Sequence, residues 1–469
     1  MPPATLTPLR AIAVIGLLMA AGPNCAAQAK AADDFEIRRD VVRSGFDGKT
    51  NWVHARAGVI PGSVPRVVMT MQKMRLDRSD VFFGLHSLHT RDLGRTWSEP
   101  VLQPGLDRRA EADGVIVGVS DFTPKWHAAS GRLLGIGHTV RYRDDHLVPS
   151  AVRRRETAYS VYDPARDRWG PWRVLEMPDE PRFHGAGAGC VQRWDLEDGT
   201  ILLPIYFKPQ GTDPYQTAVL RCTFDGEELR LREVGTPVAL PVARGMYEPS
   251  LTRFGGRYFL TLRNDEAGYV TTSADGLTFD APVAWTFDDG APLGNYNTQQ
   301  HWVTRPDGLY LVYTRRGAGN DHVFRHRAPL FIARVDPEKR RIIRATERVL
   351  VPNHGARLGN FGATEVTPSE TWVTVTEWMQ GPAPHHFDPE YTRRYGADNR
   401  VWVARRTRRP CARDRRLRTS GPDGWAEAHR AAPPARFRGP RDSDERGRAR
   451  WLPGRPAGRT RVNPAVRRS

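Results

Sequence analysis

The amino-acid sequence predicts an all-β fold built from repeated antiparallel sheets. Three observations carry this prediction: short apolar runs, Gly-bearing turns in front of most of them, and a turn motif that recurs along the chain. The runs have the length of strands, and helical periodicity is nearly absent. They lie at residues 67–71, 133–137, 201–206, 258–262 and 309–313.

The turn motif supplies the repeat. Residues 90–97, Thr-Arg-Asp-Leu-Gly-Arg-Thr-Trp, have the form S/T-x-D-x-G-x-T-W, and residues 273–279 are a variant one residue shorter. With three degenerate relatives, the motif aspartates fall at positions 92, 163, 225, 275 and 336, at intervals of 71, 62, 50 and 61 residues. Each interval suits one blade of a propeller, and residues 33–404 hold roughly six of them. The sequence therefore predicts a six-bladed β-propeller of four-stranded antiparallel blades.

The residues of the motif are expected to be structural. In such a turn the aspartate accepts backbone N–H groups, the glycine takes a positive φ, and the aromatic ring covers the edge of the blade. The residues given this role are Asp92, Gly94, Trp97, Asp275, Gly276 and Phe279.

Residues 1–31 have the order of a secretory signal peptide. Arg10 precedes an apolar run over residues 11–21, and residues 27–31 contain two A-x-A-like cleavage sites. No other stretch approaches about 20 apolar residues, so no membrane span is expected. We therefore expect a secreted or periplasmic protein, whose propeller domain covers residues 33–404.

The net charge of +17 is concentrated at the C-terminus. Residues 401–469 hold 20 arginines and 6 acidic residues, whereas the rest of the chain is nearly neutral. A nucleic-acid partner is therefore not expected for the body, and we expect a monomer. Residues 405–469 are either a basic arm that binds polyanions or a disordered Arg/Pro-rich tail, and we favour the second interpretation.

Cysteine and histidine spacing predicts no metal site. Cys190 and Cys222 could form one disulfide, or remain two buried free thiols. His385 and His386 with Asp388 resemble a metal-ligand cluster only weakly. We expect no metal and no other cofactor.

The turn motif and the predicted propeller resemble the sialidase superfamily, whose propellers carry such Asp boxes, over most of residues 40–404. The resemblance implies three arginines that bind the substrate carboxylate. It also implies an aspartate acid/base, and a tyrosine nucleophile that is supported by a glutamate.

The glutamate and one arginine are the best match. Residues 248–251, Glu-Pro-Ser-Leu, open a predicted strand, and Arg263 closes the next one. Arg327 precedes an apolar strand, as the third arginine of the family does. The resemblance thus assigns Glu248 to catalysis and Arg263 and Arg327 to substrate binding.

Two further positions have rivals. Arg56 precedes Ile-Pro with two extra residues in between, and Arg66 is the competing candidate for the first arginine. Asp80 lies at the family distance before the first Asp box, with Asp77 as the alternative acid/base.

The nucleophile departs from the family pattern. Where the family has Tyr-Ser, this chain has Phe361, which has no hydroxyl group. Tyr247 adjoins Glu248, but neighbours on a strand point to opposite faces. Tyr296 is a second tyrosine that another blade could supply.

The chemistry of these residue types suits an acidic sugar. Guanidinium groups bind carboxylates through a planar fork, and a pair such as Asp80 and Glu248 is the usual machinery of glycoside hydrolysis. Polar residues near Tyr296 and His301 are predicted to bind sugar. The histidines considered as proton carriers are His138, His184, His301 and His322.

Three functions follow from these expectations. The first is an exported, exo-α-sialidase-like glycoside hydrolase that acts on a terminal acidic sugar. The second is a polysaccharide lyase that acts on uronates, in which Tyr296 pairs with His301 or His322. The third is a propeller that binds a glycan without turnover.

Overall fold

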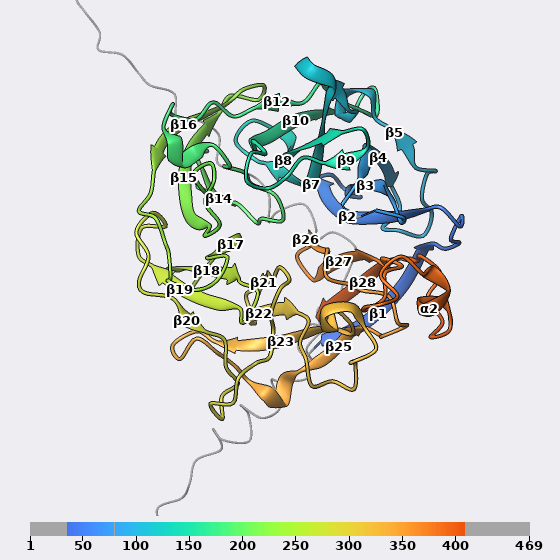
Figure 1. Cartoon of the computed structure of the whole chain (residues 1–469). Helices are drawn as coiled ribbons and strands as arrows, with labels where there is room; N and C mark the ends of the chain where they lie inside the picture. Colours follow the sequence, from blue (N-terminus) through green and yellow to red (C-terminus); the bar gives the residue numbers. More distant parts are fainter. Residues whose placement is uncertain (1–34, 79, 409–469) are drawn as a thin grey trace, which may run out of the picture. The chain divides into compact units, whose positions relative to one another are not determined.

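The computed structural model describes residues 35–78 and 80–408, which form a β-propeller (Figure 1). Its strands form antiparallel sheets, in which most neighbouring strands are consecutive in the sequence. The first three sheets are β2 (Thr50–Ile60), β3 (Arg66–Arg75), β4 (Phe82–Thr90) and β5 (Val101–Leu102); β6 (Arg109–Ala110), β7 (Val115–His127), β8 (Arg132–Arg143), β9 (His146–Leu147), β10 (Thr157–Asp163), β11 (Arg168–Trp169) and β12 (Arg173–Val174); and β13 (Trp194–Asp195), β14 (Ile201–Phe207), β15 (Gln216–Phe224) and β16 (Leu229–Val234).

The remaining sheets complete the ring, and the last of them includes the first strand of the chain. They are β17 (Tyr247–Phe254), β18 (Arg257–Arg263), β19 (Tyr269–Ser273) and β20 (Val283–Ala284); β21 (His301–Arg305), β22 (Gly308–Tyr313), β23 (Leu330–Asp336), β24 (Arg341–Ile342) and β25 (Arg348–Val351); and β26 (Gly362–Thr367), β27 (Glu370–Thr376), β28 (Val401–Arg408) and β1 (Phe35–Arg43). Short helical turns lie at Pro104–Leu106, Ala112–Gly114, Pro181–Phe183, Phe324–His326, Arg344–Thr346 and α2 (Pro389–Arg393).

The predicted all-β propeller with four-stranded antiparallel blades is confirmed, but the count of six such blades is wrong. Five sheets have a main path of four strands, whereas the sheet of β6 to β12 has seven strands. The reason is the length of its central strands. With 13 and 12 residues, β7 and β8 extend past the blade and pair with the short strands β6 and β9.

The inner strands of neighbouring sheets pack against one another. Strand β2 contacts β7 and β26, and β17 contacts β14 and β21. The core lies between the sheets: one buried cluster, for example, joins Val312 and Ile332 of one sheet to Val373 and Val375 of the next. This packing fixes the positions of the inner strands, where the candidate site lies.

The two ends of the propeller domain pair with each other. Strand β1 runs antiparallel to β28, from Phe35 opposite Arg408 to Arg43 opposite Val401. Strand β28 (Val401–Arg408) thus joins the first strand of the chain to the last sheet. The strand continues beyond the predicted boundary at 404, because Arg405 pairs with Asp40 and its guanidinium stacks on Trp372.

Several further expectations can be compared with the described residues. Cys190 and Cys222 are both buried and free, so the disulfide alternative is wrong. Within the described ranges, no helix is long and apolar enough to cross a membrane, and no cluster of three or more His, Cys, Asp or Glu side chains is arranged to hold a metal ion. The predicted signal peptide and nearly all of the predicted tail lie outside these ranges.

The motif turns have local hydrogen bonds. Asp92 accepts the backbone N–H of Thr96 at 3.0 Å and hydroxyl groups of Thr90 and Thr96 at 2.7 and 2.6 Å. In the second turn, Asp275 accepts the N–H groups of Leu277 and Thr278 at 2.8 Å. Their glycines have the left-handed φ that such turns need, 75° at Gly94 and 80° at Gly276. Trp97 packs near Trp372, and Phe279 lies against the core.

Replacing Asp92 by asparagine is expected to lower the melting temperature at neutral pH, and the loss should disappear in acid. Hydrogen bonds from the Thr96 side chain and backbone hold the pKa of Asp92 well below its ordinary value. A carboxyl whose pKa is lower in the folded state stabilises the fold above its unfolded pKa of about 3.9, and this stabilisation is lost as pH falls further. Melting curves of both proteins between neutral pH and pH ~2 check this; a constant difference across that range would contradict it.

Candidate active site

Left-handed backbone marks the inner strands around the propeller axis. His54 on β2, Asp121 on β7 and Glu248 on β17 have φ values of 57°, 53° and 46°, and each lies where the register of its strand shifts. Cys190 and Asn297, which precede β13 and β21, have similar values. Non-glycine residues in this region cost about 1–3 kcal/mol each and cluster at functional sites. The repeated bulge turns polar side chains out of the strand register, toward one another.

Asp121 is the centre of a buried ionic cluster. Its carboxylate lies 2.9 Å from Arg56 Nη2, 3.4 Å from His54 Nε2 and 3.9 Å from His138 Nε2. Burial alone would raise the pKa of Asp121, but these neighbours hold it well below its ordinary value. Burial lowers the pKa of both histidines, so Asp121 is an ionised carboxylate between a guanidinium and two neutral imidazoles.

Arg56 lies beneath this cluster and is fully buried. Its Nη2 donates to Asp121, to Gln299 Oε1 at 3.0 Å and to Cys190 Sγ at 3.2 Å. Nη2 of Arg56, a residue that was predicted to bind the substrate, is therefore bound to other groups of the protein. Its rival Arg66 lies elsewhere, where it donates to the Tyr162 hydroxyl group at 2.7 Å.

Glu248 and Arg263 form a buried ion pair on neighbouring strands. Arg263 Nη1 lies 2.6 Å from both carboxylate oxygens of Glu248, and its Nη2 donates to Asn297 Oδ1 at 2.7 Å. Burial opposes the charge of Arg263, but Glu248 outweighs it and raises the pKa of the guanidinium. The structure thus brings together the two residues that matched the family best.

Arg327 lies beside this pair, bound mainly to neutral groups. Its Nε donates to the carbonyl oxygen of Asn297 at 3.1 Å, and its Nη1 lies 3.4 Å from Asn360 Oδ1. A Cβ at residue 359 would lie 2.4 Å from Arg327 Cδ, so Gly359 is what lets the arginine approach the chain. Burial and the charge of Arg263 lower the pKa of Arg327 to about 9.

Arg357 is the least compensated charge of the cluster. It is 5% exposed, its guanidinium carbon lies 3.2 Å from the centre of the Trp378 ring, and its buried Nε has no hydrogen-bond partner among the described residues. Burial and the positive charge of Arg327 lower the pKa of Arg357 well below its ordinary value. Among the described residues, no carboxylate lies within ion-pairing distance of Arg327 or Arg357.

Asp80 lies at the edge of the same group of charges. Its φ is 57°, and its carbonyl oxygen accepts the hydroxyl group of Tyr142 at 3.2 Å. Its negative charge raises the pKa of Arg357 and of His54, against the larger effect of burial. The alternative Asp77 is an exposed residue that pairs with Arg75 at 2.7 Å.

The residue at the expected nucleophile position is buried. Phe361 has no exposed surface, and its ring meets the edge of His301 at 5.1 Å between centres. Tyr247 donates its hydroxyl group to Asp265 and lies under the guanidinium of Arg263, 4.6 Å from the ring centre. Burial raises the pKa of Tyr247 to about 12, so its hydroxyl group is engaged and neutral.

The predicted tyrosine–histidine pair involves a different histidine. His301 is buried against Ser250 Oγ at 2.7 Å, and burial lowers its pKa to about 3. His322 stacks on Tyr395. Tyr296 instead bonds His326 Nδ1, so the pairing with His301 or His322 is wrong.

Sequence reasoning missed three functional candidates: Asp121, Arg357 and His326. Asp121 had a weak signal, since it stands two residues before Thr123 as Glu248 stands two before Ser250, and both pairs lie at strand bulges. Arg357 had no signal in the sequence, because it is a candidate only through its burial without an ion-pair partner among the described residues, which the structure alone shows.

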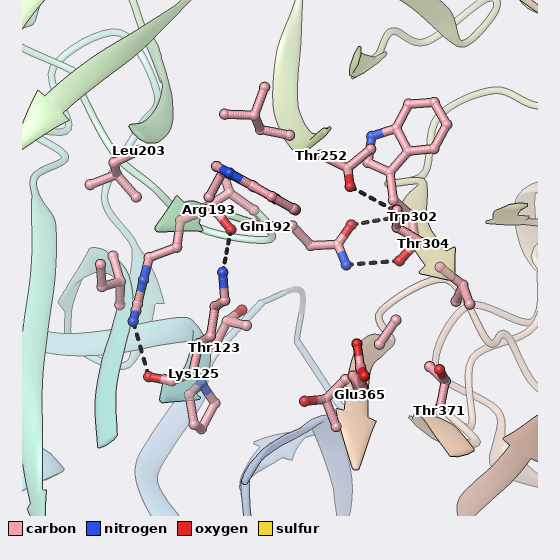
Figure 2. A pocket seen from close by; sticks show the side chains of 18 residues that line it. Thr123, Lys125, Gln192, Arg193, Leu203, Thr252, Trp302, Thr304, Glu365 and Thr371 are labelled. Carbon is pink, nitrogen blue, oxygen red and sulfur yellow. Dashed lines mark hydrogen bonds between the residues drawn. The ribbon is translucent and has the colours of Figure 1, made fainter. Parts of the chain in front are cut away.

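A separate hollow of about 220 Å³ lies further along the same inner strands (Figure 2). Thr123, Thr252 and Thr304 line it, and Lys125 donates to the carbonyl oxygen of Arg193 at 2.9 Å. None of the predicted catalytic or substrate-binding residues lines this hollow.

The described residues are similar in fold to several solved structures. A protein of unknown function from Dyadobacter fermentans aligns with a TM-score of 0.53 at 15% identity, over 80% of this chain and 99% of its own. The Hadza microbial sialidase Hz136 aligns with a TM-score of 0.52 at 11% identity, over 78% of this chain and 68% of its own. Trypanosoma rangeli sialidase in complex with 2,3-difluorosialic acid gives 0.51 at 13% identity, over 79% and 58%.

At these identities the similarity shows the fold alone. The chain spans little more than half the length of the trypanosomal sialidases. No protein-family profile and no curated protein matches the sequence.

Proposed function

We propose that the chain is a sialidase-like glycoside hydrolase that acts on a terminal acidic sugar. The observation that carries the proposal is the pair Arg327 and Arg357, two buried guanidinium groups that form no ion pair with a described carboxylate and whose pKa values are lowered by burial and by neighbouring arginines. A sugar carboxylate would provide the missing charge and accept hydrogen bonds from both forks. Arg263 would orient the sugar from its position beside Glu248.

The carboxylates near these arginines would perform the chemistry. Glu248 and Asp80 are the catalytic residues that the sialidase resemblance assigns, and Asp121 adds a third carboxylate that stays ionised. Because Phe361 has no hydroxyl group, we assign the attack to a water molecule that gives its proton to Asp121, while Asp80 protonates the leaving glycosidic oxygen; this attack inverts the anomeric centre. Asp121 is unprotonated at neutral pH, as a general base must be, and its lowered pKa makes it a weak base.

The location and assembly of the enzyme are part of the same proposal. The signal-peptide pattern of residues 1–31 supports export to the periplasm or beyond the cell. The near-neutral body supports a glycan rather than a nucleic-acid partner, and we propose that the enzyme acts as a monomer.

The test is a panel of fluorogenic glycosides with the full-length protein. We expect release from a sialoside or another acidic glycoside and none from neutral glycosides, because only the former carry a carboxylate. NMR of the first product should show the inverted anomer. Release from neutral glycosides at equal rates would contradict the role of the arginines, and retention of configuration would contradict the role of Asp121. Binding of an acidic sugar without turnover would indicate a glycan-binding propeller.

A further inference from the structure

Tyr296, His326 and Asp321 form a hydrogen-bonded triad in the part of the structure that holds Arg263 and Arg327. The Tyr296 hydroxyl oxygen lies 2.5 Å from His326 Nδ1, and His326 Nε2 lies 3.0 Å from Asp321 Oδ1. A carboxylate only accepts, so Nε2 carries the imidazole proton and Nδ1 is free to accept from the phenol. The order is hydroxyl, imidazole, carboxylate, which is the arrangement that prepares a hydroxyl group to lose its proton.

The triad is linked to Arg263 and Arg327, which are proposed to bind the carboxylate. Asn297, the neighbour of Tyr296, binds Arg263 through its side chain and Arg327 through its carbonyl oxygen. On the other side, His326 immediately precedes Arg327. A phenol hydrogen-bonded to an imidazole therefore lies next to the groups that would hold a carboxylate.

The local backbone is held in an unusual form. Arg325 and His326 are consecutive non-glycine residues with φ of 54° and 52°. The Arg325 side chain reaches Asn297 Oδ1 at 3.2 Å, and Arg316 covers the Tyr296 ring at 4.0 Å. Strain of this kind persists where the surroundings fix it, and it clusters at functional sites.

We infer that Tyr296 is the catalytic proton carrier of a second activity at this site, the β-elimination of a glycan linked through C4 of a uronate. The inference rests on the carboxylate binding by Arg327 and Arg357 described under the proposed function. Neutralising the carboxylate makes the proton on the adjacent carbon easier to remove, and no water, metal or oxidant is consumed.

The proton transfers balance within the triad of Tyr296, His326 and Asp321. Tyr296 passes its hydroxyl proton to His326 Nδ1, and Asp321 stabilises the imidazolium. The phenolate takes the C5 proton, the electron pair forms the C4–C5 double bond, and the C4–O bond breaks. The leaving oxygen takes the proton from Tyr296, which regains its own from His326, so the protein ends unchanged.

The experiment uses the full-length protein with polygalacturonate, alginate and heparosan, and follows the ultraviolet absorbance of the unsaturated uronate. Tyr296→Phe is expected to lower the rate on the order of 100-fold or more, while glucuronate binding measured by calorimetry is unchanged. His326→Gln should behave similarly, and Asp321→Asn should lose about tenfold. Tyr395→Phe and His322→Gln change the same residue types at positions outside the triad, and these control variants should keep the full elimination rate.

Deuterium at C5 distinguishes a chemical role of Tyr296 from a structural one. The wild-type rate should show a primary isotope effect, because the C5–H bond breaks in the step that Tyr296 performs. Absence of unsaturated product from all three polymers, or an unchanged rate in Tyr296→Phe, would overturn the inference, as would a covalent glycosyl-Tyr296 adduct. Glucuronate binding by Arg357 variants tests the proposed function separately. Loss of binding supports the role of Arg357 in holding the carboxylate, and unchanged binding contradicts it.

Discussion

Replacing Arg357 by methionine is expected to weaken the binding of an acidic sugar by about 10- to 100-fold and to leave the protein as stable as before, or more stable. A hydrogen bond to a charged group contributes about 1.5–3 kcal/mol, which sets the loss of affinity. The gain in stability has a different cause. Arg357 is buried over Trp378, its Nε has no hydrogen-bond partner among the described residues, and burial lowers the pKa of its guanidinium; methionine fills similar space without a buried charge.

Calorimetric titration and thermal unfolding check the two halves of this prediction. Arg109→Met is the matched control, because Arg109 also stacks on a tryptophan, Trp172, at 3.8 Å, but donates to its carbonyl oxygen at 2.8 Å. The control should bind the sugar normally. Weaker binding together with a clear loss of stability in Arg357→Met would show that this arginine is structural.

Replacing Glu248 by glutamine is expected to abolish turnover and to destabilise the fold by about 3 kcal/mol. The first effect follows from the loss of a catalytic carboxylate, which is worth at least about 100-fold in rate. The second follows from Arg263, which would remain buried without its counter-charge; the side chains of Glu248 and Arg263 are 13% and 8% exposed. Turnover of an acidic glycoside and denaturant unfolding measure the two effects.

The double variant Glu248→Gln, Arg263→Met separates the two effects. Removing both charges should restore most of the lost stability, since an apolar pair can replace a buried ion pair. Turnover should remain absent. If stability recovers and turnover returns with it, Glu248 acts only by holding the fold.

The strands were predictable because their signal is local. Short apolar runs between turn dipeptides define strands without knowledge of the partner strand, as residues 201–206 and 258–262 do within β14 and β18. The blade count was not predictable in the same way. The ends of β7 and β8 pair with β6 and β9, which are close in sequence but only two residues long, so no apolar run marks them.

Whether a residue of the candidate site could be predicted also depended on how close in the sequence its partner lies. Glu248 and Arg263 were found because both lie on neighbouring strands of one sheet, so that their spacing in the sequence reflects their contact. Asp121 contacts Arg56 from a different sheet, and no short motif records that meeting. The choice of His326 over His322 for Tyr296 accompanies a left-handed backbone at residues 325 and 326, which is uncommon for non-glycine residues and has no signal in the sequence.

The pairing of β1 with β28 has a consequence for biosynthesis. Asp40 and Arg405, which bond each other across this pair, are 365 positions apart, so the last sheet is completed only after residue 408 has been synthesised. Until then β1 has no partner and β27 has a bare edge, and unpaired strands of this kind recruit other chains. Non-local pairs also form slowly, because a long loop must close first. A ribosome that stalls before residue 401 therefore releases an open ring that is prone to aggregate, and the cell must keep the nascent chain apart from its neighbours until its final strand arrives.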